Sequence, residues 1–139
     1  MAEPHRSRGL VDTSVIIEFE QVHPGGLPSE IAVSAVTLAE LAAGPHATDD
    51  ADERARRQDR LQRTEATFES LPVDGAVARA YGRVYAAVAA AGRKARGRRA
   101  FDLLIAATAL ASELPLYTRN PHDFAELEDL IEVIAVPTS

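Results

Sequence analysis

The sequence predicts a single α/β domain over residues 1–139, built as three layers (α/β/α) around a parallel sheet of about five strands. Short apolar runs alternate along the chain with longer segments of helical spacing, which is the pattern of a parallel sheet covered by helices. Glycine- and proline-containing turns separate these segments, and no internal repeat or linker divides the chain. A length of 139 residues is ordinary for one domain.

The first half of the chain begins with a short buried strand over residues 8–12, followed by a helix over 13–20. A turn at Gly25–Pro28 leads to a second strand at 31–34 and a helix at 35–43, which Gly44 and Pro45 end. Residues 48–70 are highly charged and contain neither glycine nor proline, with only a narrow apolar stripe. They predict a long, largely solvated helix whose interleaved arginines and acids form i,i+4 pairs.

The second half continues with a weak third strand at residues 71–74 and a helix capped by Asp74 and ended by Gly92. Its stripe of Tyr81, Val84, Tyr85 and Val88 predicts a core or dimer-interface face. A basic loop at 93–99 precedes a nearly continuous apolar helix at 101–112, which suits burial against the sheet. Strands at 114–118 and 132–136 complete the sheet.

Composition excludes several classes of function. The absence of cysteine rules out disulfides, thiolate zinc sites and cysteine nucleophiles. The strongest apolar run, residues 103–111, is too short to span a bilayer, and no targeting segment is recognisable, so we expect a cytoplasmic protein. A net charge of −6 argues against a general nucleic-acid coating protein. This charge does not exclude an enzyme that binds nucleic acid through a local basic patch and a bound cation.

Four acidic residues stand at the ends of predicted strands or the starts of predicted helices: Asp12, Glu40, Asp102 and Asp123. Ligands of parallel α/β sheets bind beyond the carboxyl ends of the strands. Four carboxylates gathered there would resist ionisation unless a cation joined them. Oxygen ligands suit Mg²⁺, and two such ions can activate a water and stabilise the leaving oxygen of a phosphodiester. The pattern therefore predicts a site for one or two divalent ions.

Each of these acids also has a purely structural explanation. Asp12 could be a turn or cap residue, and Glu40, three residues after Thr37, fits a capping box. Asp102 in a first helical turn would be stabilised by the helix dipole, and Asp123 could cap the segment that follows it. These explanations are four separate ones, whereas a metal site explains all four acids at once. Taken together, the acids favour the metal site.

Four blocks of sequence stand out together: LVDTS at 10–14, VTLAEL at 36–41, FDLLIAATA at 101–109, and LYTRN at 116–120 with Asp123 and Phe124. These blocks resemble the PIN domain, and more closely the VapC toxins of bacterial VapBC toxin–antitoxin systems. The resemblance covers nearly the whole chain, in order and at family-like spacing.

This resemblance implies a PIN-fold ribonuclease that uses Mg²⁺ or Mn²⁺ and cuts RNA, commonly tRNA or ribosomal RNA, to arrest growth. It places the acidic site on Asp12, Glu40, Asp102 and Asp123. The hydroxyl that the family often sets beside them falls on Thr118, with Thr13 and Ser14 nearby. It also implies a homodimer and a VapB-like antitoxin that inserts a segment across the active site.

The basic loop at 93–99 directly precedes Asp102, so its side chains are candidates for binding phosphates that flank the cut bond. The candidate residues are Arg93, Lys94, Arg96, Arg98 and Arg99. A solvated loop or a docking surface for an acidic antitoxin segment is an equal alternative. The four histidines, His5, His23, His46 and His122, are scattered through the predicted tail and loops and offer no acid–base pair. Three other functions stay open: an RNA-maturation PIN nuclease without an antitoxin, an inactive PIN binding module and a phosphatase.

Overall fold

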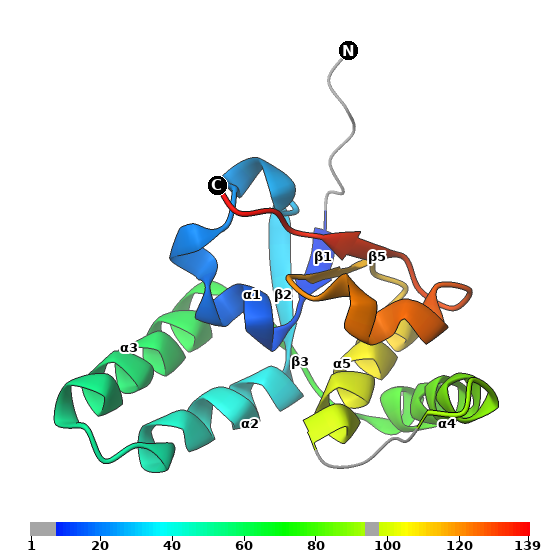
Figure 1. Ribbon diagram of the computed structural model, residues 1–139, viewed down its shortest axis with the longest axis horizontal. Coiled ribbons are helices and arrows are strands. Elements are labelled where there is room, and N and C mark those ends of the chain that lie inside the picture. The colour runs from blue at the N-terminus through cyan, green and yellow to red at the C-terminus, as the bar shows by residue number, and fades with distance from the viewer. Residues whose placement is uncertain (1–7, 94–97) are drawn as a thin grey trace.

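Five strands form one parallel sheet in the computed structural model, which describes residues 8–93 and 98–139 (Figure 1). The strands are β1 (Arg8–Val11), β2 (Glu30–Ser34), β3 (Glu69–Leu71), β4 (Leu116–Thr118) and β5 (Val133–Ala135). Their order across the sheet is β3-β2-β1-β4-β5, with every neighbouring pair parallel. The five-stranded parallel sheet that the sequence predicts is confirmed. The chain runs outward from β1 to β3 and then returns to β4, so the strand order reverses between β1 and β4.

The α-helices are α1 (Thr13–Ile17), α2 (Ala35–Ala43), α3 (Ala51–Thr67), α4 (Gly75–Ala90) and α5 (Arg98–Ser112), and the first four begin at polar caps. The described residues also form four short 3₁₀ segments: η1 (Phe19–Gln21), η2 (Pro24–Gly26), η3 (Gly44–Ala47) and η4 (Pro121–Leu127). The side chains of Asp12, Ser34, Asp50 and Asp74 each accept a hydrogen bond from a backbone N–H in the first turn that follows. Such caps satisfy donors that a helix N-terminus otherwise leaves unpaired.

The two faces of the sheet carry separate apolar clusters, which gives the three layers. Leu10, Ala32 and Leu116 are aligned across three strands and pack with α4, α5 and η4 on one face. The alternate residues Val11 and Tyr117 point to the opposite face, where they pack with α1 and α2. Figure 1 shows α1, α2 and α3 gathered on one side and α4 and α5 on the other. The predicted α/β/α arrangement is therefore confirmed.

Several boundaries differ from those that the sequence predicts. The third strand covers 69–71 instead of 71–74, because Pro72 has no N–H to donate to the strand ladder and Asp74 caps α4 through Val77 N at 3.0 Å. The first helix ends at Ile17, and residues 19–21 form a separate 3₁₀ turn. Helix α5 begins at Arg98, three residues before its predicted start.

Helix α3 is largely solvated, as its composition predicts. Thr64 is its only buried residue. The ion pairs Arg57–Glu53 (Nε to Oε2, 2.8 Å) and Arg63–Asp59 (Nε to Oδ2, 2.9 Å) are spaced i,i+4 along its surface. Within the two described stretches of the chain, no helix is both long enough and apolar enough to cross a membrane.

Candidate acidic site at the β1–β4 edge

Asp12 follows β1 directly and lies where the strand order reverses, with only 4% of its surface exposed. Its Oδ1 accepts hydrogen bonds from Ser14 Oγ at 2.6 Å and from Val15 N at 3.3 Å. Its Oδ2 accepts one from Thr118 Oγ1, at the end of β4, at 2.6 Å. Asp12 is therefore a helix cap, as its structural explanation proposes, but capping occupies only one of its two oxygens. The hydroxyl expected beside the acidic site is present at Thr118.

The two hydroxyls that hold Asp12 are themselves fixed by backbone amides of the turn after β4. Arg119 N donates to Ser14 Oγ at 3.1 Å, and Asn120 N donates to Thr118 Oγ1 at 2.9 Å. Each oxygen of the Asp12 carboxylate therefore accepts a hydrogen bond from a hydroxyl that itself accepts one from a backbone amide. The orientation of Asp12 is set before any ligand arrives.

Glu40 is attached to the same region through Thr13. Thr13 Oγ1 donates to Glu40 Oε1 at 2.5 Å and lies 2.9 Å from Thr37 Oγ1. The capping-box explanation of Glu40 is wrong. The cap of α2 is Ser34, whose Oγ accepts from Val36 N at 3.0 Å, and Thr37 lies inside the helix. Glu40 is instead held by a neighbour on α1, which ties α2 to the acidic edge.

Asp102 lies on α5 and is affected by the other three carboxylates. Its pKa is raised to about 6 by partial burial first, and then by the negative charges of Asp12, Glu40 and Asp123, while the positive charge of Arg99 opposes the rise. The helix-dipole explanation of Asp102 is wrong, because α5 begins at Arg98 and its first turn contains no acid. The electrostatic influence of all three partners means that the four acids share one region.

Asp123 lies on η4 and is the last of the four acids predicted from the sequence. The cap of η4 is Asn120, and Asp123 N donates to Asn120 O at 3.0 Å, so the capping explanation of Asp123 is wrong as well. The carbonyl oxygen of Asp123 accepts a hydrogen bond from Arg99 Nη1 at 2.5 Å. Asp123 is therefore fixed through its main chain and its side chain is not used as a cap.

Burial disfavours the ionised form of two of the four acids. Burial raises the pKa of Asp12 against the lowering effect of its hydrogen bonds from Ser14 and Thr118, and the pKa of Asp102 is raised too. A divalent cation would favour the ionised form of both. Among residues 8–93 and 98–139, no three acidic or imidazole side chains are close enough to hold an ion by themselves. The donor set is entirely carboxylate and hydroxyl oxygen, which fits Mg²⁺ or Mn²⁺ that retains part of its water.

The described part of the basic loop is engaged in ion pairs. Arg93 Nη1 lies 2.5 Å from Glu126 Oε2, and Arg99 Nη2 lies 2.5 Å from Glu126 Oε1. Lys94 and Arg96 lie outside the described residues, as does the side chain of Arg98. Glu126 is missing from the sequence-based site because its stretch of acids resembles a solvated surface. The available sequence signal for Glu126 is its spacing of three residues from Asp123. In the structure the Glu126 side chain is only 8% exposed.

The Tyr81–Val88 stripe on α4 divides between the core and the surface. Val84 and Val88 are fully buried in the cluster beneath α4 and α5, and Tyr81 packs against that cluster. Tyr85 is 50% exposed. The core assignment therefore holds for the valines, and the stripe leaves one aromatic side chain at the surface.

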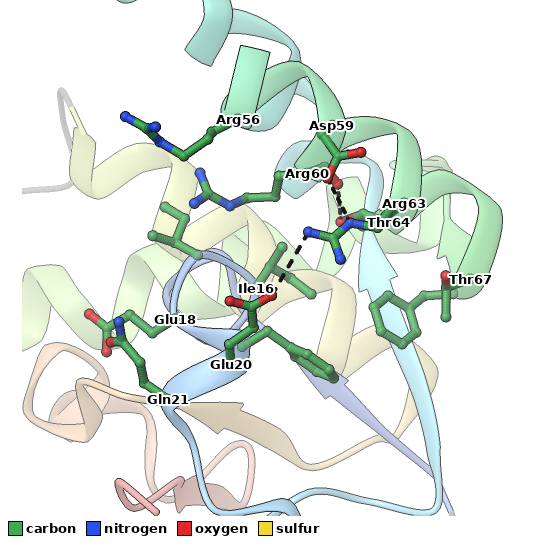
Figure 2. A pocket seen from close by; sticks show the side chains of 13 residues that line it. Ile16, Glu18, Glu20, Gln21, Arg56, Asp59, Arg60, Arg63, Thr64 and Thr67 are labelled. Atoms are coloured by element: carbon green, nitrogen blue, oxygen red, sulfur yellow. Dashed lines mark hydrogen bonds and ion pairs between the residues drawn. The ribbon is translucent and has the colours of Figure 1, made fainter. Parts of the chain in front are cut away.

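A separate pocket of about 350 Å³ lies between α3 and the segment that joins α1 to η1 (Figure 2). Apolar side chains of Ile17, Phe19 and Phe68 line it, and the two phenylalanine rings lie 5.6 Å apart. Figure 2 shows Arg63 of α3 directed at Glu20, with Arg63 Nη2 4.0 Å from Glu20 Oε2. None of the four site acids lines this pocket. The sequence predicts only ion pairs along α3 and does not reveal the pocket.

Comparison with known proteins agrees with this fold. The PIN domain family model matches residues 9–130. The chain is 39% identical to Ribonuclease VapC5 of Mycobacterium tuberculosis over 133 residues, covering 92% of this chain and 95% of that protein. It is also 39% identical to Ribonuclease VapC8 of the same species over 113 residues, covering 78% of this chain and 96% of that protein.

Solved structures give the same result. The crystal structure of VapBC-5 from M. tuberculosis superposes with a TM-score of 0.82 at 39% identity, covering 94% of this chain and 99% of that chain. The structure of FitAcB from Neisseria gonorrhoeae superposes with a TM-score of 0.71 at 27% identity, covering 90% and 95%. The parallel sheet with an acidic edge is that of a PIN-domain protein, and the chain belongs to the PIN domain family. Within that family it is similar to the VapC proteins of M. tuberculosis.

Proposed function

We propose that this protein is the toxin of a type II toxin–antitoxin system and acts as a divalent-metal-dependent endoribonuclease. The observation that carries the proposal is the buried carboxylate of Asp12 at the β1–β4 edge, fixed by two hydroxyls, together with Asp102, on which the charges of Asp12, Glu40 and Asp123 act. Relatives at 39% identity are named ribonucleases, which supports the same class of activity here. The substrate is RNA of the tRNA or ribosomal class, met in the cytoplasm.

Asp12, Glu40, Asp102 and Asp123 would hold the Mg²⁺ or Mn²⁺. When bound, the ion supplies activation of a water and charge stabilisation at the phosphodiester. Ser14 and Thr118 orient Asp12 and favour its ionised form by donating to its two oxygens. Thr13 orients Glu40 with one hydrogen bond. Asp102 must lose its proton before it can serve as a ligand, because metal ligands bind in their deprotonated form.

The basic segment 93–99 supplies contacts to RNA phosphates in this proposal. It ends three residues before Asp102, so a strand of RNA bound there would pass beside the acids. Arg93 retains 44% exposure in spite of its pair with Glu126, and exposed guanidinium groups bind phosphate with two parallel hydrogen bonds. Arg99 is mostly buried, so its contribution to the site is made inside the protein.

A VapB-like antitoxin is the proposed partner, and the pocket beside α3 is its proposed docking surface. Two of the compared structures are described as VapBC and FitAcB assemblies, which supports an antitoxin for this chain. Ile17 and Phe19 are large apolar side chains left exposed at the pocket. Arg60 also lines it and has no ion-pair partner among the described residues. An amphipathic segment with acidic side chains would cover the apolar surface and pair with that arginine.

Cleavage of RNA by purified protein tests the function directly. Wild-type protein in Mg²⁺ should cut tRNA or ribosomal RNA at discrete positions, and Asp102→Asn should lower the rate by at least about 100-fold, the upper end of what loss of an outer-shell residue costs. Asp74→Asn is the matched control, because asparagine caps a helix about as well as aspartate and Asp74 caps α4 outside the site. Equal cleavage by wild type and Asp102→Asn would overturn the proposal. A folded wild type that binds no Mn²⁺ and cuts no RNA would indicate an inactive binding module.

The partner is tested by co-purification with the small protein encoded beside the toxin gene, together with a measurement of the homodimer that we also propose. Phe19→Asp should weaken the complex at least about tenfold, since it places a charge in an apolar contact. Val73→Asp, at an exposed valine outside the pocket, should leave it unchanged. A complex unaffected by Phe19→Asp would move the docking surface elsewhere.

A further inference from the structure

Two pairs of residues face each other where α5 meets η4. Arg99 and Asp102 are three residues apart on α5, and Asp123 and Glu126 are three residues apart on η4. At this spacing Arg99 and Asp102 share a face of α5, whereas the backbone of η4 is kinked at Phe124, between Asp123 and Glu126. Arg99 reaches both members of the other pair, donating to the carbonyl oxygen of Asp123 and to Glu126 Oε1, each at 2.5 Å. It therefore ties together the two elements that carry Asp102 and Asp123.

The positive charge of Arg99 acts on Asp102, yet the acid with which Arg99 forms an ion pair is Glu126 and not a member of the acidic site. An arginine that paired instead with Asp102 or Asp123 would occupy the oxygens that a cation needs and would cancel part of their charge. Glu126 also receives Arg93 and is only 8% exposed, so its position is restrained from two sides. Glu126 is thus placed to keep Arg99 away from the site.

A second observation is that Arg99, within the part of the chain that the structure describes, leaves one of its buried donors unpaired in its present position. Its Nε is buried and has no hydrogen-bond partner among the described residues. An unpaired buried donor is costly, and a carboxylate oxygen would satisfy it. The present position of Arg99 is therefore maintained by Glu126 and by the Asp123 carbonyl, at the expense of one unsatisfied donor.

We propose that Glu126 is a positioning residue: it sequesters Arg99 on the main chain of Asp123 and so leaves the side chains of Asp102 and Asp123 free to bind a divalent ion. This inference rests on the proposed function, because it assumes a metal site at the four acids. It assigns a role to two residues that touch neither the ion nor the substrate.

Calorimetric titration with Mn²⁺ tests the sequestration, with thermal unfolding of each variant to confirm that it folds. Glu126→Gln keeps the size of the side chain but removes the charge that holds Arg99, and it should weaken Mn²⁺ binding about tenfold or more. Adding Arg99→Gln removes the competing cation, so the double variant should bind Mn²⁺ more tightly than Glu126→Gln alone. Arg57→Gln is the control, because Arg57 pairs with Glu53 on α3, outside the acidic site, and it should stay within about twofold of wild type.

The outcomes separate this inference from the proposed function. If wild type binds Mn²⁺ and Glu126→Gln binds it equally tightly, the metal site stands and the positioning role of Glu126 is wrong. A double variant that binds no better than Glu126→Gln also overturns the sequestration, since Arg99 would then not be the competitor. If folded wild-type protein binds no Mn²⁺, both proposals fall together.

Discussion

The hydroxyl of Thr118 donates a 2.6 Å hydrogen bond to Oδ2 of Asp12, joining the ends of β4 and β1 across the point where the strand order reverses. Both residues are buried, and 106 positions separate them in the sequence. Doubly wound sheets bind ligands at such a reversal because the connections leave the strands there in opposite directions. The Thr118–Asp12 hydrogen bond therefore lies at the point where the strand order reverses. It also helps to hold Asp12, whose carboxylate accepts three hydrogen bonds.

Replacing Thr118 by valine keeps the shape of the side chain and removes the donor to Asp12. The hydrogen bond lowers the pKa of Asp12, so its loss raises that pKa further and leaves the carboxylate less able to bind a cation. We expect Mn²⁺ affinity near neutral pH to fall about 10- to 100-fold in calorimetry. Thr118→Ser retains the hydroxyl and should stay close to wild type. Equal affinities for the valine and serine variants would show that the donor does not matter.

The raised pKa of Asp102 makes stability depend on pH in a defined direction. Its value of about 6 in the folded protein exceeds the ordinary value of 3.8. At pH values between these two pKa values, the folded state therefore binds more protons than the unfolded state. The stability that protonated Asp102 contributes is lost as pH rises from about 4 to about 6. Without metal, Asp102→Asn should raise the melting temperature relative to wild type at pH 7.5 and have a smaller effect at pH 4.5. A difference that is the same at both pH values would contradict the coupling.

Gly9 on β1 is required by the close approach of Tyr117 on β4. A Cβ atom at position 9 would lie 2.4 Å from Tyr117 Cε1, and Tyr117 is buried and cannot turn freely aside. We expect Gly9→Ala to lower the free energy of unfolding by about 1–3 kcal/mol, measured by urea denaturation. Gly82→Ala is the matched control. It lies in the exposed face of α4 with no atom within 4 Å, and it should stabilise the protein by about 0.5–1 kcal/mol.

The sequence predicts the sheet well, because its strands follow local patterns, whereas the metal-binding role of the four acids stays a prediction. Asp12 and Thr118 come directly after or at the end of apolar strands, and parallel strands bring such ends to one edge. The roles of the acids were harder to predict. Helix α5 begins earlier than its apolar run, which takes Asp102 out of the first turn, and Ser34 rather than Thr37 caps α2.

Contacts between distant elements explain what the sequence does not reveal. Glu126 belongs to an acidic stretch that looks solvated, and only the packing of η4 against α5 shows that Arg99 and Arg93 both reach it. The pocket beside α3 is a second feature of this kind, because Phe19 and Phe68 are far apart in the sequence and come together only in the folded protein. Such features depend on tertiary geometry, which spacing along one element cannot supply.

The rate of RNA cleavage as a function of free Mg²⁺ tests the central claim most directly, namely that the acids around Asp12 form a metal-dependent RNA-cutting centre. Wild-type protein should show no cleavage in excess chelator and a rate that rises and saturates as Mg²⁺ is added. Asp12→Asn should stay inactive at every Mg²⁺ concentration, whereas Asp74→Asn should follow the wild-type curve. Undiminished cleavage in chelator, or by folded Asp12→Asn protein, would contradict the account.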